Sequence, residues 1–233
     1  MAQEQFIDSL RLASRMLPPP RVNSDQSGQT DAYLASKLHA ADIWLTPKSV
    51  EGFEPADFAD WPKKEREELA KEVNEFLTIA KQVPANKPAT KTQSNQARKH
   101  LERVIQIVRG HLLPEWLEAQ QRMMQEARSA AEAEGWYVQM DEKEVLESLL
   151  GSYKAPRLRI RTHAREVVLD PVARFGSGRK GVVDLVVMPT YETAYLVAFK
   201  DGQWQIVSPR GTAHSRPFTQ ATLVNTITRL SHQ

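Results

Sequence analysis

The sequence of 233 residues contains no cysteine, which excludes disulfide bonds, thiolate nucleophiles and cysteine-ligated zinc. It also lacks any apolar run approaching the roughly 20 residues that a membrane-spanning helix requires. The first residues, M-A-Q-E-Q-F-I-D, have neither the basic segment nor the long apolar segment of a secretory signal. Together these absences predict a cytoplasmic protein that does not enter a membrane.

Several motifs of catalysis and metal binding are missing as well. There is no G-x-S-x-G nucleophile turn and no G-x-x-x-x-G-K-[ST] phosphate loop, so a serine hydrolase or a P-loop NTPase finds no support. None of the six histidines falls at a spacing typical of zinc ligands. We therefore expect no metal and no cofactor, and we favour a protein without catalytic activity.

Charge is unevenly distributed along the chain although the formal net charge is only +2. Residues 151–233 hold 12 Lys and Arg against 5 Asp and Glu, a net charge of +7. Residues 1–150 hold 19 against 24, a net charge of −5. This asymmetry predicts an anionic partner for the second part and a protein partner for the acidic helical part, or mutual neutralisation of the two.

The spacing of apolar residues predicts three segments. Residues 1–83 have helical periodicity and form a predicted all-helical region. Residues 84–95, P-A-N-K-P-A-T-K-T-Q-S-N, contain two prolines and few large apolar side chains, which is typical of a linker. The third segment, residues 96–233, is predicted to fold as an α+β region.

Within this α+β region, residues 96–150 are predicted to form two amphipathic helices, followed by a short helix at a capping box of Asp141 and Glu144. After Gly151 the apolar period changes from 3.6 to 2, which indicates strands. Five strands are predicted, over residues 157–162, 166–170, 181–188, 193–199 and 203–208. Asp201-Gly202 is typical of a type I′ hairpin, and a helix from Thr219 to Leu230 closes the chain. The predicted class is α+β, with a mainly antiparallel five-stranded sheet and flanking helices.

The most distinctive segment of the chain reads R-L-R-I-R-T-H-A-R over residues 157–165. Because side chains alternate between the two faces of a strand, a strand through this segment would gather its basic residues on one face. Guanidinium groups about 7 Å apart can contact successive phosphates, so this strip is a candidate nucleic-acid interface. The alternative is a solvated face whose charges are neutralised by neighbouring strands. The predicted basic strip contains Arg157, Arg159, Arg161, His163 and Arg165.

A second candidate is the loop Gly176–Gly181, G-S-G-R-K-G, which matches G-x-G-x-x-G by spacing. A dinucleotide site requires a helix after this motif, whereas the apolar β-branched run after Gly181 predicts a strand. We therefore interpret the loop as a glycine-containing hairpin. Arg179 and Lys180 would extend the basic surface if the loop folds near the strip.

Asp184 is the third candidate, because a carboxylate inside the apolar run V-V-D-L-V-V needs a partner. Its spacing to Lys200 resembles in outline the restriction-endonuclease-like nucleases. In that family an Asp on one strand and an acid-x-Lys triplet on the next hold a divalent metal and activate water. Here Ala198 stands where the second carboxylate belongs. A structural ion pair between Asp184 and an arginine is the alternative explanation.

Three hypotheses of function follow from these patterns. The leading one is a non-catalytic binding or adaptor protein whose basic sheet face binds an anionic partner, with nucleic acid as the expected partner. The second is a degenerate metal-dependent nuclease that uses Asp184 and Lys200 as catalytic residues. The third is a structural subunit of a larger protein complex.

Overall fold

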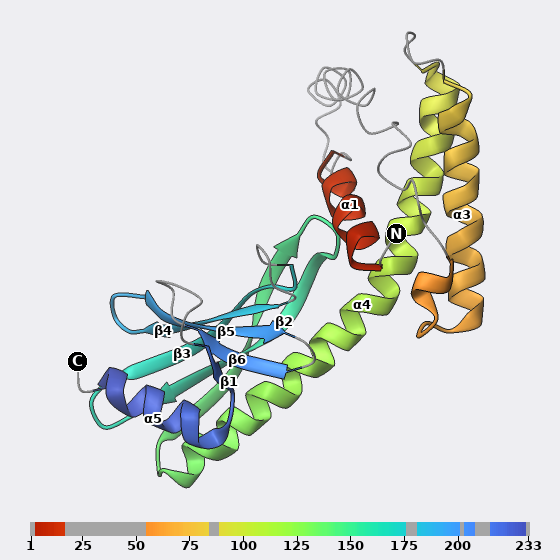
Figure 1. The fold of residues 1–233 in the computed structure, drawn as a ribbon. Coiled ribbons are helices and arrows are strands. Elements are labelled where there is room, and N and C mark those ends of the chain that lie inside the picture. The colour runs from red at the N-terminus through yellow and green to blue at the C-terminus, as the bar shows by residue number, and fades with distance from the viewer. Residues whose placement is uncertain are drawn as a thin grey trace, which may run out of the picture. The chain divides into compact units, whose positions relative to one another are not determined.

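The computed structural model describes residues 3–16, 55–83, 89–175, 181–200, 203–207 and 215–231. The chain divides into two compact units, residues 1–111 and 112–233 (Figure 1). Helices and an antiparallel sheet occur together, so the predicted α+β class is confirmed. No helix of the described ranges combines the length and apolar character needed to cross a bilayer.

The first unit is helical in its described part, as predicted for residues 1–83. It contains α1 (Gln3–Met16), the short 3-10 helix η2 (Pro55–Phe58), α3 (Lys63–Lys81) and the beginning of α4 (Lys91–Ala133). Helix α3 buries one apolar face, formed by Leu69, Val73, Phe76 and Ala80.

Acidic side chains of α3 contact basic side chains of α4 within this unit. Glu72 contacts Nδ1 of His100 at 2.7 Å, and Glu65 contacts Nδ1 of His111 at 3.0 Å. The His111 ring also stacks on Trp61, with ring centroids 3.9 Å apart. Part of the acidic surface for which the sequence predicts a protein partner therefore makes contacts inside the first unit.

Helix α4 differs from the prediction at both its start and its middle. Thr90 and Gln93 form a reciprocal capping box: the Gln93 side chain accepts the Thr90 N–H at 3.0 Å, and the Thr90 hydroxyl accepts the Gln93 N–H at 3.3 Å. Residues 91–95 of the predicted linker are consequently helical, while residues 84–88 lie outside the described ranges. The two predicted helices are one, because α4 continues through Pro114 without a break.

The described residues of the second unit form a sheet of seven strands rather than five, joined in chain order with every neighbouring pair antiparallel. The five predicted strands correspond to β2 to β6, and the sheet adds β1 and the two-residue β7 at its edges. The described hairpin partners Lys200 and Gln203 flank Asp201-Gly202, which itself lies outside the described ranges. The strands are β1 (Tyr137–Glu147), β2 (Gly151–Arg161), β3 (Glu166–Ala173), β4 (Val182–Val187), β5 (Glu192–Lys200), β6 (Gln203–Val207) and β7 (Arg216–Pro217).

Residues 137–147 form strand β1, where the sequence predicts a short helix at Asp141 and Glu144. The prediction of helices over the whole of residues 96–150 is therefore wrong. The segment Y-V-Q-M-D-E-K has period 2, with Val138 and Met140 packed against the core. All eleven residues of β1 pair with β2. This long pairing outweighs the local capping signal, which is worth only about 1 kcal/mol.

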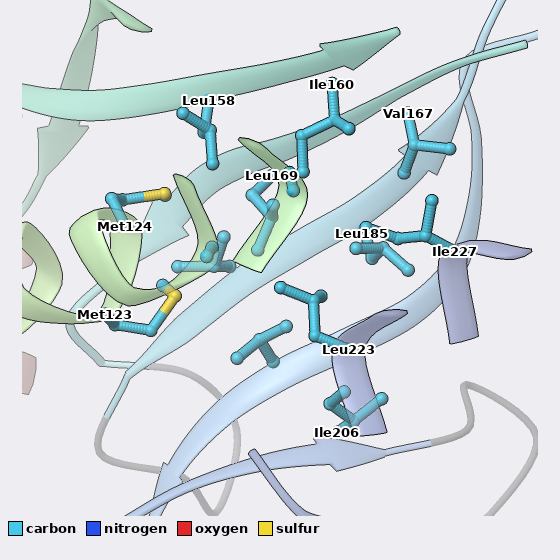
Figure 2. Packing of buried hydrophobic residues seen from close by; sticks show 14 of the residues in the cluster. Met123, Met124, Leu158, Ile160, Val167, Leu169, Leu185, Ile206, Leu223 and Ile227 are labelled. Carbon is cyan, nitrogen blue, oxygen red and sulfur yellow. The ribbon is translucent and has the colours of Figure 1, made fainter. Parts of the chain in front are cut away.

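One face of the sheet forms the core of the second unit. Figure 2 shows Met123 and Met124 of α4 beside Leu158 and Leu169 of the sheet. The final helix α5 (Gln220–Ser231), predicted over residues 219–230, contributes Leu223, Ile227 and Leu230 to the same cluster. Burial of this face leaves the polar residues of β1 to β4 on the opposite face.

Candidate functional site

The face of the sheet opposite the core, here called the polar face, carries the predicted arginines. Leu158 and Ile160 are buried in the core, so the alternation of β2 directs Arg157, Arg159 and Arg161 to the polar face. Their side chains are 22%, 31% and 66% exposed, respectively. Exposure therefore increases toward the end of β2, and the three guanidinium groups are not equivalent.

The predicted basic strip ends at Arg161, because residues 162–165 form the turn between β2 and β3. The Thr162 hydroxyl accepts the N–H groups of Ala164 and Arg165 at 3.3 and 3.0 Å, and the Thr162 N–H donates to the Arg165 carbonyl at 2.9 Å. His163 and Arg165 therefore lie in this turn, with exposed side chains, and not on a strand face. The prediction of one continuous five-residue strip is wrong for this reason.

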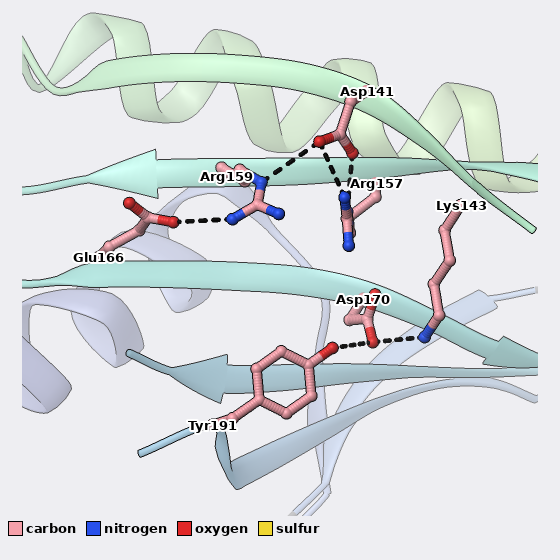
Figure 3. Close-up of polar contacts among 7 residues, drawn as sticks. All are labelled: Asp141, Lys143, Arg157, Arg159, Glu166, Asp170 and Tyr191. Carbon is pink, nitrogen blue, oxygen red and sulfur yellow. Dashed lines mark hydrogen bonds and ion pairs between the residues drawn. The ribbon is translucent and has the colours of Figure 1, made fainter. Parts of the chain in front are cut away.

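Carboxylates of neighbouring strands form ion pairs with the three arginines of β2 (Figure 3). Asp141 of β1 accepts two hydrogen bonds from Arg157, at 2.7 and 2.9 Å, and a third from Arg159 at 3.2 Å. Glu166 of β3 then bridges Arg159 and Arg161 at 3.1 and 3.2 Å. The result is a chain of three guanidinium groups and two carboxylates, with a net charge of +1.

The electrostatics of Asp141 follow from these contacts. Hydrogen bonding to the Arg157 guanidinium is the largest influence and lowers the pKa of Asp141 below its ordinary value, against a smaller opposing effect of burial. Asp141 is therefore ionised at neutral pH, and any phosphate that approached Arg157 or Arg159 would have to compete with it.

The exposed end of the polar face adds an aromatic residue that the sequence analysis did not single out. Tyr137 pairs directly with Arg161 across β1 and β2 and is 63% exposed. The Arg161 guanidinium carbon lies 5.9 Å from the centroid of the Tyr137 ring, within the range of a cation–π contact. A cation and an exposed ring thus lie side by side near His163 and Arg165.

A second polar cluster lies across β3 and β4. Asp170 is only 3% exposed, and its Oδ2 atom accepts hydrogen bonds from Lys143 and Tyr191 (Figure 3). Tyr191 has a φ of 57°, a left-handed conformation that is uncommon for a bulky residue. The hydrogen bond to Asp170 raises the pKa of the Tyr191 hydroxyl to about 12, with a smaller contribution from burial.

Asp184 is the direct cross-strand partner of Asp170, and Thr193 donates a hydrogen bond to it at 3.2 Å. Lys200 lies four residues along β5 from Leu196, the residue paired with Asp184. This displacement corresponds to about 13 Å along a strand. The carboxylate opposite Asp184 is that of Asp170. A nuclease site that uses Asp184 and Lys200 stays a prediction.

Other predicted site features fall outside what the structure describes. Arg179 and Lys180 belong to residues 176–180, which are not described, and the side chain of Lys200 is not described either. The described ranges contain no group of three or more histidine or carboxylate side chains that could hold a metal ion.

Sequence reasoning missed the partners that define both clusters. Asp141 was assigned to a helix cap, and Asp170 was not singled out although V-V-L-D-P-V resembles the run around Asp184. The alternation in V-Q-M-D-E-K was the available signal for Asp141 and Lys143.

No protein-family model, curated protein or solved structure matches this chain, so its function has to be argued from these residues.

Proposed function

We propose that the protein is a non-catalytic binding protein. Its binding surface is the exposed end of the polar face, and its expected anionic partner is nucleic acid. The binding residues are Arg161, His163 and Arg165, with Tyr137 beside them. The observation that carries the proposal is the gradient of exposure along β2, which leaves Arg161 66% exposed while Arg157 is 22% exposed.

The chemistry of these side chains fits a phosphate backbone. Guanidinium groups bind phosphate through two parallel N–H donors, and an exposed ring next to a cation offers a stacking surface for an unpaired base. The net charge of +7 over residues 151–233 supplies a long-range attraction for a polyanion. Arg179 and Lys180 would add to this attraction from the following loop.

The test is fluorescence anisotropy of labelled single-stranded and duplex DNA and RNA, with salt varied from about 50 to 200 mM. The double variant Arg161→Glu and Arg165→Glu should weaken binding strongly and make its salt dependence less steep, by about 0.7 to 0.9 per lost phosphate contact. Arg157 and Arg159 are unsuitable for this test, because reversing their charge would break the ion pairs with Asp141.

The matched control is the pair of substitutions Arg122→Glu and Arg128→Glu, since these two exposed arginines of α4 form described ion pairs with Glu118 at 3.1 Å and Glu132 at 2.7 Å, within the same helix. It removes the same charge from the second unit without touching the polar face. If the control lost as much binding affinity as the variant of Arg161 and Arg165, the attraction would be non-specific. If the wild-type protein bound no nucleic acid at low salt, the proposal would be refuted.

A further inference from the structure

The two carboxylate oxygens of Asp170 differ in the hydrogen bonds that they accept. Lys143 and Tyr191 both donate to Oδ2, whereas Oδ1 is buried and has no hydrogen-bond partner among the residues that the structure describes. A buried acceptor without a donor loses its hydration and gains nothing in return. A neighbouring side chain that can donate a hydrogen bond would satisfy this atom.

Asp184 stands opposite Asp170 in the strand register. Asp170 and Asp184 are direct partners in the β3–β4 register, so their side chains project from the same face of the sheet. Directly opposed Cβ atoms in an antiparallel pair are about 4.5 to 5.5 Å apart. Two carboxyl groups on directly opposed residues, in a partly buried environment, disfavour the state in which both are ionised.

We propose that Asp170 and Asp184 share one proton at pH values where an isolated aspartic acid is already ionised, and that the carboxyl group of Asp184 carries this proton and donates it to Oδ1 of Asp170. Asp170 is the ionised partner because Lys143 and the Tyr191 hydroxyl both donate to it. Asp184 accepts only the single Thr193 hydroxyl at 3.2 Å among the described contacts. The pair then carries one negative charge, which the Lys143 ammonium group balances.

The surrounding groups support this assignment. Burial is the largest influence on Asp184 and raises its pKa, and the charge of Asp170 raises it further. The Thr193 hydrogen bond and the Lys143 charge act in the opposite direction. Arg157 of β2 lies near enough to influence Tyr191 electrostatically, but its own hydrogen bonds go to Asp141.

A metal ion between the two carboxylates is the competing explanation. The Lys143 ammonium group lies 2.5 Å from Asp170 Oδ2 and would repel such a cation. The pair also lacks a third carboxylate or histidine in the described part of the chain, and two carboxylates are few ligands for Ca²⁺. A proton needs no further ligands.

The test compares the thermal unfolding of the wild type with that of Asp184→Asn between pH 4 and pH 8. In the wild type the folded state holds the proton more tightly than the unfolded chain, where Asp titrates near 3.9. The wild-type Tm should therefore fall as the pH rises from about 4 through the raised folded pKa. Asp184→Asn should lack this fall, because an amide keeps a donor for Oδ1 and cannot ionise.

Two further variants make the comparison specific. Glu192→Gln removes an exposed carboxylate from β5 and should retain the wild-type pH dependence. Asp170→Asn removes the charge that Lys143 requires and should lower the Tm at every pH. If Asp184→Asn lowered the Tm and Asp170→Asn did not, Asp170 would be the residue that carries the proton. This result would overturn the assignment.

NMR titration of the aspartate carboxyl carbons in the wild-type protein checks the proposal without any substitution. The Asp184 signal should shift at a pH well above the ordinary range for Asp. A midpoint near 3.9 would overturn the proposal, and so would a Tm that rises with added Mg²⁺ or Ca²⁺ in the wild type but not in Asp184→Asn.

Discussion

Asp141 binds Arg157 through both of its carboxylate oxygens, with N···O distances of 2.7 and 2.9 Å between β1 and β2. Bidentate pairs of this kind combine charge with a fixed geometry. The contact converts the centre of the predicted basic strip into part of the sheet's own framework. It also joins the edge strand β1 to β2 by side chains as well as by main-chain pairing.

We expect Asp141→Asn to destabilise the fold by about 1 to 3 kcal/mol, because it removes the negative charge and one of the two acceptor oxygens that the partly buried guanidinium groups of Arg157 and Arg159 share. Urea unfolding at neutral pH measures this loss. Glu142→Gln is the matched control on the same strand: Glu142 and Lys154 are 3.4 Å apart and highly exposed, and such pairs contribute about 0 to 1 kcal/mol. Equal losses in both variants would contradict a special role for Asp141.

Acid should weaken the same contact. The pKa of Asp141 is lower in the folded state than in the unfolded chain, mainly through the Arg157 hydrogen bond. Its contribution to stability is therefore complete above the ordinary Asp pKa of about 3.9 and is lost as the pH falls through the lowered value. Urea midpoints measured between pH 5 and pH 2 should converge for wild type and Asp141→Asn at the acidic end. A constant difference across this range would refute the prediction.

Arg157 and Arg161 should respond differently to truncation. Arg157→Ala leaves the Asp141 carboxylate in a partly buried position and should cost about 1 to 3 kcal/mol. Arg161→Ala affects an exposed pair and should cost about 0 to 1 kcal/mol, while weakening any binding of nucleic acid. Paired measurements of unfolding free energy and of DNA or RNA affinity separate the two roles, and a reversed order in both would contradict the exposure gradient.

Gly181→Ala should destabilise the second unit by about 1 to 3 kcal/mol through overpacking. A Cβ atom at Gly181 would lie 2.3 and 2.5 Å from two ring carbons of Trp116, a buried side chain of α4. The indole also donates a hydrogen bond to the Tyr153 hydroxyl at 3.2 Å, so the ring cannot move without loss. Urea unfolding followed by tryptophan fluorescence reports the change.

Gly110→Ala provides the control for this substitution. Nothing lies within 4 Å of a Cβ atom at residue 110, which belongs to the interior of α4. Alanine has the higher helix propensity there, so stability should stay constant or increase. A similar loss in both variants would show that crowding against Trp116 is not the cause.

The sequence by itself determined the α+β class, the helical character of the described part of residues 1–83, the strands β2 to β6 and the final helix. These elements follow from a periodicity of 3.6 or 2 within one short segment, and local side-chain geometry is sufficient to produce that pattern. The same alternation also placed Arg157, Arg159 and Arg161 on one face. It failed after Arg161, where the Thr162 hydroxyl closes a turn.

Only the tertiary structure decided which charged side chains on that face are exposed and can contact a binding partner. Asp141 is 16 residues from Arg157 along the chain, and Asp170 and Asp184 are 14 residues apart, yet strand pairing makes them neighbours. Their ionisation and exposure depend on these cross-strand distances, which no local pattern encodes. For the same reason β1 became a strand: its pairing partner lies in β2, and the local signal at Asp141 favoured a helix.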